Sequence, residues 1–198
     1  MKLSKSALLQ RCFMAMLFIT ASVSAQKLID KKGKITFEAS EETFEPVKAS
    51  NSSVTAIVNT ETNEIAALAL MKGFRFKNSL MEEHFNENYI ESETYPKAKF
   101  RGKLLDFEYS QLGNENTSVV VEGKIELRGK EKPIRTTLNV KKYNGSIIMQ
   151  GSFKVTPADF DIEIPSIVRK KIANEIIFQK ALNNLNNTKQ CNANQIID

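Results

Sequence analysis

The sequence predicts a mainly β protein: a closed, antiparallel, eight-stranded β-barrel with one amphipathic helix and a short helical turn. The first observation is the strict apolar–polar alternation over much of residues 118–140, which is typical of an antiparallel sheet with one solvated face. The second is that this pattern recurs in about eight segments. The third is that Gly102, Gly123 and Gly151 fall on apolar faces, where strand glycines mark bends or close backbone approach, as at barrel corners. Closure would also remove exposed edges.

Residues 1–25 have the features of a signal peptide. Basic residues precede an apolar segment from Phe13 to Val23, and residues 23–25 form a small-residue cleavage site. The apolar segment is too short to cross a membrane. We therefore expect cleavage after Ala25 and a periplasmic or secreted protein that is not an integral membrane protein.

Removal of 25 of the 198 residues would leave 173, enough for one domain with a substantial core. We place a β-barrel domain at residues 26–182 and an Asn-rich flexible tail at residues 183–198. The leader carries three of the 28 basic residues and none of the 23 acidic ones, so the net charge falls from +5 to +2. This charge gives no argument for nucleic-acid binding. Cys191 would be the only remaining cysteine, which excludes an intramolecular disulfide, and we interpret it as incidental.

The first strands are predicted at residues 34–39 and 54–58, which alternate, and at residues 65–71, which are continuously apolar and should be covered on both faces. Phe74 and Phe76 continue the third strand in alternation with a charged residue. Residues 59–63 form a turn rich in Asn and Thr.

A helix is predicted at residues 79–90. Ser79 followed by Glu82 is a capping-box arrangement with the serine as N-cap. Met81, Phe85 and Tyr89 then recur at i, i+4 and i+8, so they share one face of the helix. We expect this face to lie against the sheet or to plug one end of it.

Strands resume at residues 98–104 and 119–127, followed by a polar turn over residues 129–133 and a strand at 134–140. Asn144-Gly145 is a hairpin turn that needs positive φ, and it leads into a strand at residues 147–155. A short helical turn is predicted at residues 165–172, and a last strand at residues 175–180.

The residue types give little basis for catalysis. His84 is the only histidine, so a site with several histidines is excluded. An aspartate–glutamate alternation from Asp159 to Glu163 could bind a cation or form a solvated face. A lipid hydrolase or isomerase would have to use His84 or Asp159, without a base–nucleophile pair. We therefore predict that the protein is not an enzyme and has no metal and no cofactor.

Three segments together resemble the YceI-like family of exported polyisoprenoid-binding proteins. The first, residues 76–100, resembles the family's helix and the tyrosine–proline strand that follows it. The second, residues 121–134, resembles the glycine strand, Arg-Gly turn and Lys-Pro strand. The third, residues 151–162, is similar to the strand that ends in an aspartate–phenylalanine pair. The resemblance implies a lipocalin-like barrel that holds a long isoprenoid or fatty chain.

The leading hypothesis is therefore an exported carrier that sequesters or transports an apolar ligand, such as an isoprenoid, an isoprenoid quinone or a fatty chain. The alternative is an envelope interaction or stress-response module whose core is dry. The sequence is also compatible with a homodimer. The inward positions chosen as candidates for the ligand-binding lumen are Phe37, Val58, Phe74, Phe76, Phe100, Leu104, Val121, Ile125, Leu138, Met149, Phe153 and Phe178. The candidates for contacts from the helix at the mouth are Met81, His84, Phe85 and Tyr89.

Overall fold

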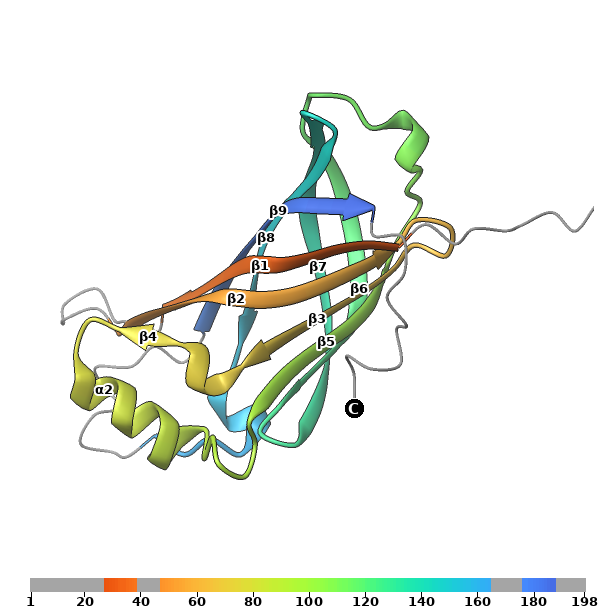
Figure 1. Ribbon diagram of the computed structural model, residues 1–198. Helices are drawn as coiled ribbons and strands as arrows, with labels where there is room; N and C mark the ends of the chain where they lie inside the picture. Colours follow the sequence, from red (N-terminus) through yellow and green to blue (C-terminus); the bar gives the residue numbers. More distant parts are fainter. Residues whose placement is uncertain (1–26, 39–46, 165–175, 188–198) are drawn as a thin grey trace, which may run out of the picture.

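The computed structural model describes residues 27–38, 47–164 and 176–187, the last as backbone only. These residues form one antiparallel sheet of nine strands (Figure 1). The strands are β1 (Lys27–Glu38), β2 (Lys48–Asn59), β3 (Glu64–Leu70), β4 (Arg75–Phe76), β5 (Lys97–Leu104), β6 (Thr117–Leu127), β7 (Lys130–Tyr143), β8 (Ser146–Val155) and β9 (Ile176–Asn187). The prediction of a mainly antiparallel β fold is confirmed. The predicted eight strands are present. Phe74 and Phe76 do not continue the third strand as predicted, because β3 ends at Leu70 and Arg75–Phe76 form the separate short strand β4, which pairs with β2.

The sheet is strongly curled, so its strands share one concave face (Figure 1). The strand order is β1-β9-β8-β7-β6-β5-β3-β2-β4, and β1 also pairs with β2. Strand β1 is therefore hydrogen-bonded to β9 on one side and to β2 on the other. The ladder between β7 and β8 is short, because it joins only residues 138–143 to residues 146–151.

Strands β1 and β2 begin well before their predicted positions, because an irregular stretch interrupts the alternation of each. In β1 the register with β2 shifts near Asp30 and Gly33. The inward and outward positions therefore do not alternate regularly before residue 34, where the sequence predicts the start of the strand. In β2 the inward Asn51 is buried, with its amide Nδ2 2.9 Å from the carbonyl oxygen of Leu70, to which it donates. Its Oδ1 accepts from the backbone of Ser53 at 2.9 Å. A buried asparagine with both groups bonded fits a strand interior, although it interrupts an apolar pattern.

The chain between β6 and β7 turns more tightly than predicted. Only Arg128 and Gly129 form the turn, at φ values of 47° and 71°, and β7 begins at Lys130. Pro133 lies within β7, where that strand pairs with β6 but not with β8. A proline is tolerated there because a strand edge without a partner does not need its N–H.

The predicted helix is present, but its cap and its second half differ from the prediction. Helix α2 spans Ser79–His84, and a π-helical turn η2 continues it over Phe85–Tyr89. The N-cap is Asn78, whose Oδ1 accepts from the backbone N–H of Leu80 at 2.9 Å. Glu82 instead accepts from the backbone N–H of Phe76 at 3.1 Å and from Arg75 at 2.8 Å. Three 3₁₀ turns complete the described helices: η1 (Met71–Gly73), η3 (Tyr109–Gln111) and η4 (Pro157–Phe160).

The last strand extends further than the sequence predicts. Strand β9 ends at Asn187, so it continues past residue 182, where the sequence placed the end of the domain. The predicted leader, the cleavage site after Ala25, the helical turn at 165–172 and Cys191 lie outside the described residues.

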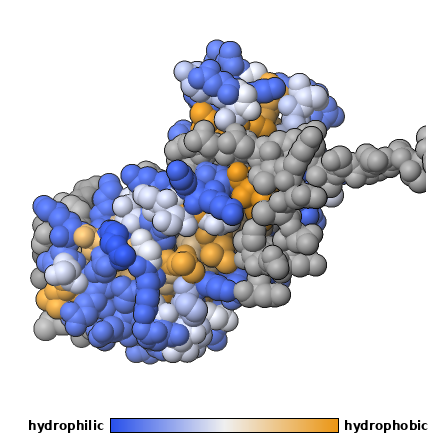
Figure 2. Space-filling model, viewed as in Figure 1, coloured by the Kyte–Doolittle hydropathy of each residue, from blue (hydrophilic) through white to orange (hydrophobic). Residues whose placement is uncertain are grey.

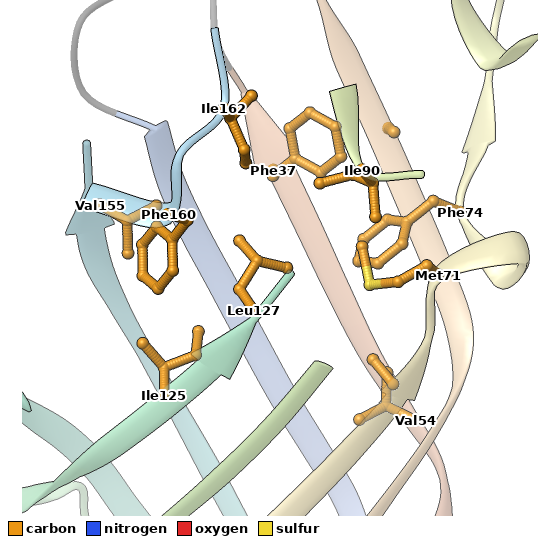
Figure 3. Close-up of a cluster of buried hydrophobic side chains, with 12 residues drawn as sticks. Phe37, Val54, Met71, Phe74, Ile90, Ile125, Leu127, Val155, Phe160 and Ile162 are labelled. Atoms are coloured by element: carbon orange, nitrogen blue, oxygen red, sulfur yellow. The ribbon is translucent and has the colours of Figure 1, made fainter. Parts of the chain in front are cut away.

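The buried side chains form two clusters at opposite halves of the concave face. The cluster at one end, which we call the packed end, includes Val58, Leu104, Val140 and Met149, all at most 1% exposed. The other cluster lies at the end near η2, because Phe85 and Tyr89 pack against it, and it gathers residues from several strands and from the loop at η4. Its members labelled in Figure 3 are Phe37, Val54, Met71, Phe74, Ile90, Ile125, Leu127, Val155, Phe160 and Ile162.

Arg128 joins three separate segments at the end of the sheet near α2. Its guanidinium donates to the carboxylate of Glu91 and to the backbone carbonyl of Asp161, and it lies 5.9 Å from the ring centroid of Tyr95. Glu91, Arg128 and Asp161 all have positive φ, at 53°, 47° and 56°. Such backbone conformations are unfavourable for non-glycine residues and persist only where the surrounding contacts fix them.

We therefore expect Arg128→Ala to lower the free energy of unfolding by about 2 kcal/mol, because it removes the hydrogen bonds that the guanidinium donates to Glu91 and Asp161. The matched control is Arg135→Ala, whose arginine pairs with Glu122 on the solvated face with 68% of its side chain exposed. That change should cost about 0.5 kcal/mol. Urea denaturation of both variants measures the difference, and equal losses would contradict the role given to Arg128.

Candidate ligand-binding cavity

A cavity of about 410 Å³ lies on the concave face, on the α2 side of the packed end. Its walls come from the inward residues of β1, β2, β3, β5, β6, β7 and β8, and α2 with η2 borders it at the mouth. The loop that contains η4 supplies Pro157, Ile162 and Ile164. A pocket of this volume is within the range of about 300–1,000 Å³ that small-molecule sites occupy.

Most of the predicted lumen residues line this cavity. They are inward residues of β1, β5, β6, β7 and β8, together with the two aromatic residues that follow β3. These residues are Phe37, Phe74, Phe76, Phe100, Val121, Ile125, Leu138 and Phe153. The four predicted mouth residues, Met81, His84, Phe85 and Tyr89, line it as well.

Three predicted lumen residues do not line the cavity. Val58, Leu104 and Met149 belong to the packed end and are almost completely buried. Alternation shows which face of a strand a residue occupies, but it does not show how far along the strand a cavity extends. The side chain of Phe178 lies outside the described residues.

Several wall residues are inward-facing but only partly buried. Phe100, Ile134, Leu138 and Phe153 are of this kind, whereas Leu104 and Val140, further along two of the same strands, are fully buried. Inward apolar side chains that keep accessible area indicate unfilled space beside them, because a packed interior leaves few voids larger than a water molecule. The concave face is therefore filled at one end and open at the other.

Phe85 holds α2 and η2 to the sheet at the mouth of the cavity. Its ring stacks on Phe37, with centroids 5.4 Å apart and an interplanar angle of 27°. It also lies 5.8 Å from Phe74 and 5.1 Å from Phe76. Met81 and Tyr89 line the cavity from the same face. This arrangement confirms the predicted helix face, which follows from the i, i+4, i+8 spacing.

The cavity offers few polar groups to a ligand. Thr136 lies on the wall, and Asn78, His84 and Tyr89 lie at the mouth. Burial raises the pKa of the Tyr89 hydroxyl, so this group stays neutral at ordinary pH. Within the described residues, no group of three or more histidine, cysteine or carboxylate side chains could hold a metal ion. The site can therefore accommodate a hydrocarbon, with only a few hydrogen-bonding groups near its mouth.

The acidic residues around η4 are engaged in ion pairs. The carboxylate of Asp161 is 2.8 Å from the amine of Lys130, and that of Asp159 is 3.6 Å from Lys132. The hydrogen bond from Lys130 holds the pKa of Asp161 below its usual value. These pairs join η4 to the part of β7 that has no β8 partner.

Sequence reasoning missed several wall residues. Ile134 lies on a predicted alternating strand and has the same periodic signal as Leu138, so alternation alone could have identified it. Ile162 and Pro157 lie in a loop, where no periodicity indicates the buried face. They line the cavity because η4 lies next to β7 where that strand lacks a β8 partner.

Comparisons with known proteins place these features in context. The family model described as "YceI-like domain" matches residues 26–182. No curated protein matches the chain. Among solved structures, a polyisoprenoid-binding domain from Saccharophagus degradans implicated in plant cell wall breakdown is similar, with a TM-score of 0.68 and 16% identity, covering 79% of this chain and 96% of its own.

Two further structures share the fold. BcnA from Burkholderia cenocepacia has a TM-score of 0.65 and 15% identity, covering 77% of this chain and 97% of its own. The YceI protein of Campylobacter jejuni has a TM-score of 0.54 and 14% identity, covering 76% of this chain and 90% of its own. None of the helices in the described residues has the length and apolar character needed to cross a bilayer.

Proposed function

The chain belongs to the YceI-like domain family, and from this premise we propose that it is an exported, non-enzymatic carrier of a long apolar ligand. The observation that carries the proposal is the cavity of about 410 Å³ with an almost wholly apolar wall. The predicted leader supports export to the periplasm or beyond. The solved domain described as polyisoprenoid-binding supports an isoprenoid, a quinone or a fatty chain as the ligand class.

Burial of a hydrocarbon chain alone can supply enough free energy for binding. Each buried methylene contributes about 0.8 kcal/mol, so a chain of 12 carbons gains on the order of 10 kcal/mol before the costs of ordering. A few hydrogen bonds from Asn78, His84 and Tyr89 at the mouth would orient a polar head. In this proposal the pairing of β1 with both β2 and β9 closes the curled sheet into a barrel around the chain.

The alternative is an envelope interaction module with a dry core. One observation favours it: Ile57, Ala66 and Leu68 occupy the positions between buried residues on β2 and β3, and they line a shallow hollow there. An apolar area is visible amid a largely hydrophilic face of the molecule (Figure 2). Apolar surface of this kind can mark a protein-binding site when it is large and contiguous.

One experiment separates these functions. The protein is produced with its own leader in a bacterial host and purified from the periplasmic fraction without detergent, and the native sample is extracted with organic solvent. Mass spectrometry of the extract should find an apolar lipid, in an amount of about one lipid molecule per protein molecule. A clean extract, together with failure of the purified protein to bind a hydrophobic fluorescent probe, would favour the dry module.

A further inference from the structure

We infer that the cavity takes one hydrocarbon chain of about 12–16 carbons, and that Phe100 forms the floor that limits this length. This inference rests on the proposed carrier function and adds the size of the ligand to it. Four features carry it: the level at which the wall residues end, the position of the Phe100 ring, the packing behind that ring and the depth of the cavity.

The cavity ends at the same level on neighbouring strands. In β7 Leu138 lines the cavity, but Val140, two residues further, is fully buried in the packed end. In β8 Gly151 lines the cavity and Met149 belongs to the packed end. Leu138 and Gly151 face each other in the β7–β8 register. The boundary is therefore a layer across the sheet and not an irregularity of one strand.

Phe100 lies at this boundary. It contacts both buried clusters, the one near α2 and the packed end. A Cβ built on Gly102 would lie 2.8 Å from Cζ of Phe100, so the phenyl ring extends over Gly102 towards the packed end. Its ring occupies the volume that a larger residue at position 102 would fill. A chain that enters from the α2 end meets this ring.

Behind the ring there is no room for more of a ligand. Leu104, two residues beyond Gly102, is completely buried, and Met149 is 1% exposed. Loop residues Phe107 and Leu112 belong to the same cluster and are buried as well. A longer chain would have to displace several close-packed side chains, which is costly in an interior of crystal-like density.

The depth of the cavity gives the length of the chain. On β6 the floor beside the Phe100 ring is Val121, a 2% exposed member of the packed end that pairs with Leu104. The lining residues of β6 run from Val121 to Leu127, which is roughly 20 Å along a strand at about 3.3 Å per residue. A strand tilt of about 35–45° reduces this to roughly 15 Å along a barrel axis. An extended chain advances at most about 1.2 Å per bond. About 12–16 carbons therefore fill the space between the mouth and Phe100.

The test measures binding of saturated fatty acids from 8 to 20 carbons by displacement of N-phenyl-1-naphthylamine from the purified protein. Affinity should rise about fourfold per added methylene, the equivalent of about 0.8 kcal/mol, and should stop rising near 14 carbons. Phe100→Ala should move this limit upwards by about two to four carbons. Phe100→Leu, a milder change, should move it by less.

Phe153→Ala is the matched control, because Phe153 is a wall residue that does not contact the packed end. This variant should bind fatty acids of every chain length more weakly by a similar factor, and the chain length at which affinity stops rising should not change. Phe100 is not the floor if the affinity of the parent protein rises steadily to 20 carbons. The same conclusion follows if the folded Phe100→Ala and Phe100→Leu proteins have the same chain-length limit as the parent. In either case the carrier function stands. If the folded parent protein binds neither the probe nor any fatty acid, the carrier function itself is wrong.

Discussion

Replacing both Phe100 and Phe153 with aspartate is expected to raise the Kd for an apolar probe at least a hundredfold. The two side chains lie on the cavity wall on β5 and β8. A carboxylate at each site would face a space with almost no hydrogen-bond donors, and an apolar ligand would have to strip water from two charges. A loss of about 3 kcal/mol of binding free energy already corresponds to a hundredfold change. Fluorescence titration of the probe measures it.

The matched control shifts each substitution by one residue to the solvated face. Arg101 and Ser152 are exposed neighbours of Phe100 and Phe153. The variant Arg101→Asp with Ser152→Asp adds the same two carboxylates without changing the cavity wall, so it should bind the probe like the parent. Circular dichroism confirms that both variants are folded. A folded Phe100→Asp, Phe153→Asp protein that binds as well as the parent would exclude this cavity as the site.

The largest effect on stability is expected for Gly123→Val, which should lower the free energy of unfolding by about 3 kcal/mol. Gly123 pairs with Gly102 in the centre of the β5–β6 ladder. A Cβ on Gly123 would lie 2.3 Å from the backbone oxygen of Arg101 and 2.6 Å from Cα of Gly102. Because both contacts are to backbone, no side-chain rotation relieves the clash and the two strands must separate.

Gly113→Val is the control for this prediction. A Cβ at Gly113 would have no atom within 4 Å, and Gly113 does not have a positive φ. This variant should unfold at nearly the same urea concentration as the parent. An unchanged midpoint for Gly123→Val would mean that the close approach of β5 and β6 is not required for the fold.

The interior glycines show how sequence reasoning can be right about position and wrong about consequence. Their placement on inward faces predicted close backbone approach, and the Gly102–Gly123 pair confirms it. The same pattern, with glycines placed among large inward residues, also predicts room for a ligand. The space at Gly102 is instead taken by the ring of Phe100, and a Cβ on Gly151 would lie 2.4 Å from Cδ2 of Leu138. Neighbouring side chains fill these positions, which alternation cannot reveal.

Periodicity predicted the strands, the helix face and most of the wall, because each depends on local spacing. It could not predict features that depend on contacts distant in sequence. Leu104 and Met149 do not line the cavity because they are buried in the packed end. That cluster includes the loop residues Phe107 and Leu112, on either side of η3. The loop at η4 joins the wall because β7 has no β8 partner beside it. The N-cap is Asn78 and not the predicted Ser79. Glu82, the predicted partner of Ser79 in the capping box, instead accepts hydrogen bonds from the backbone of Phe76 and the side chain of Arg75.

A methyl NMR titration with a 14-carbon fatty acid tests the central claim most directly. The methyl groups of Ile125, Ile134 and Ile162 lie around the cavity, whereas those of Val58, Leu104 and Met149 lie in the packed end. The account predicts saturable shifts at one equivalent for the first group and small shifts for the second. Absence of shifts at the cavity isoleucines, or shifts confined to residues of the outer hollow such as Ile57 and Ala66, would contradict ligand binding inside the sheet.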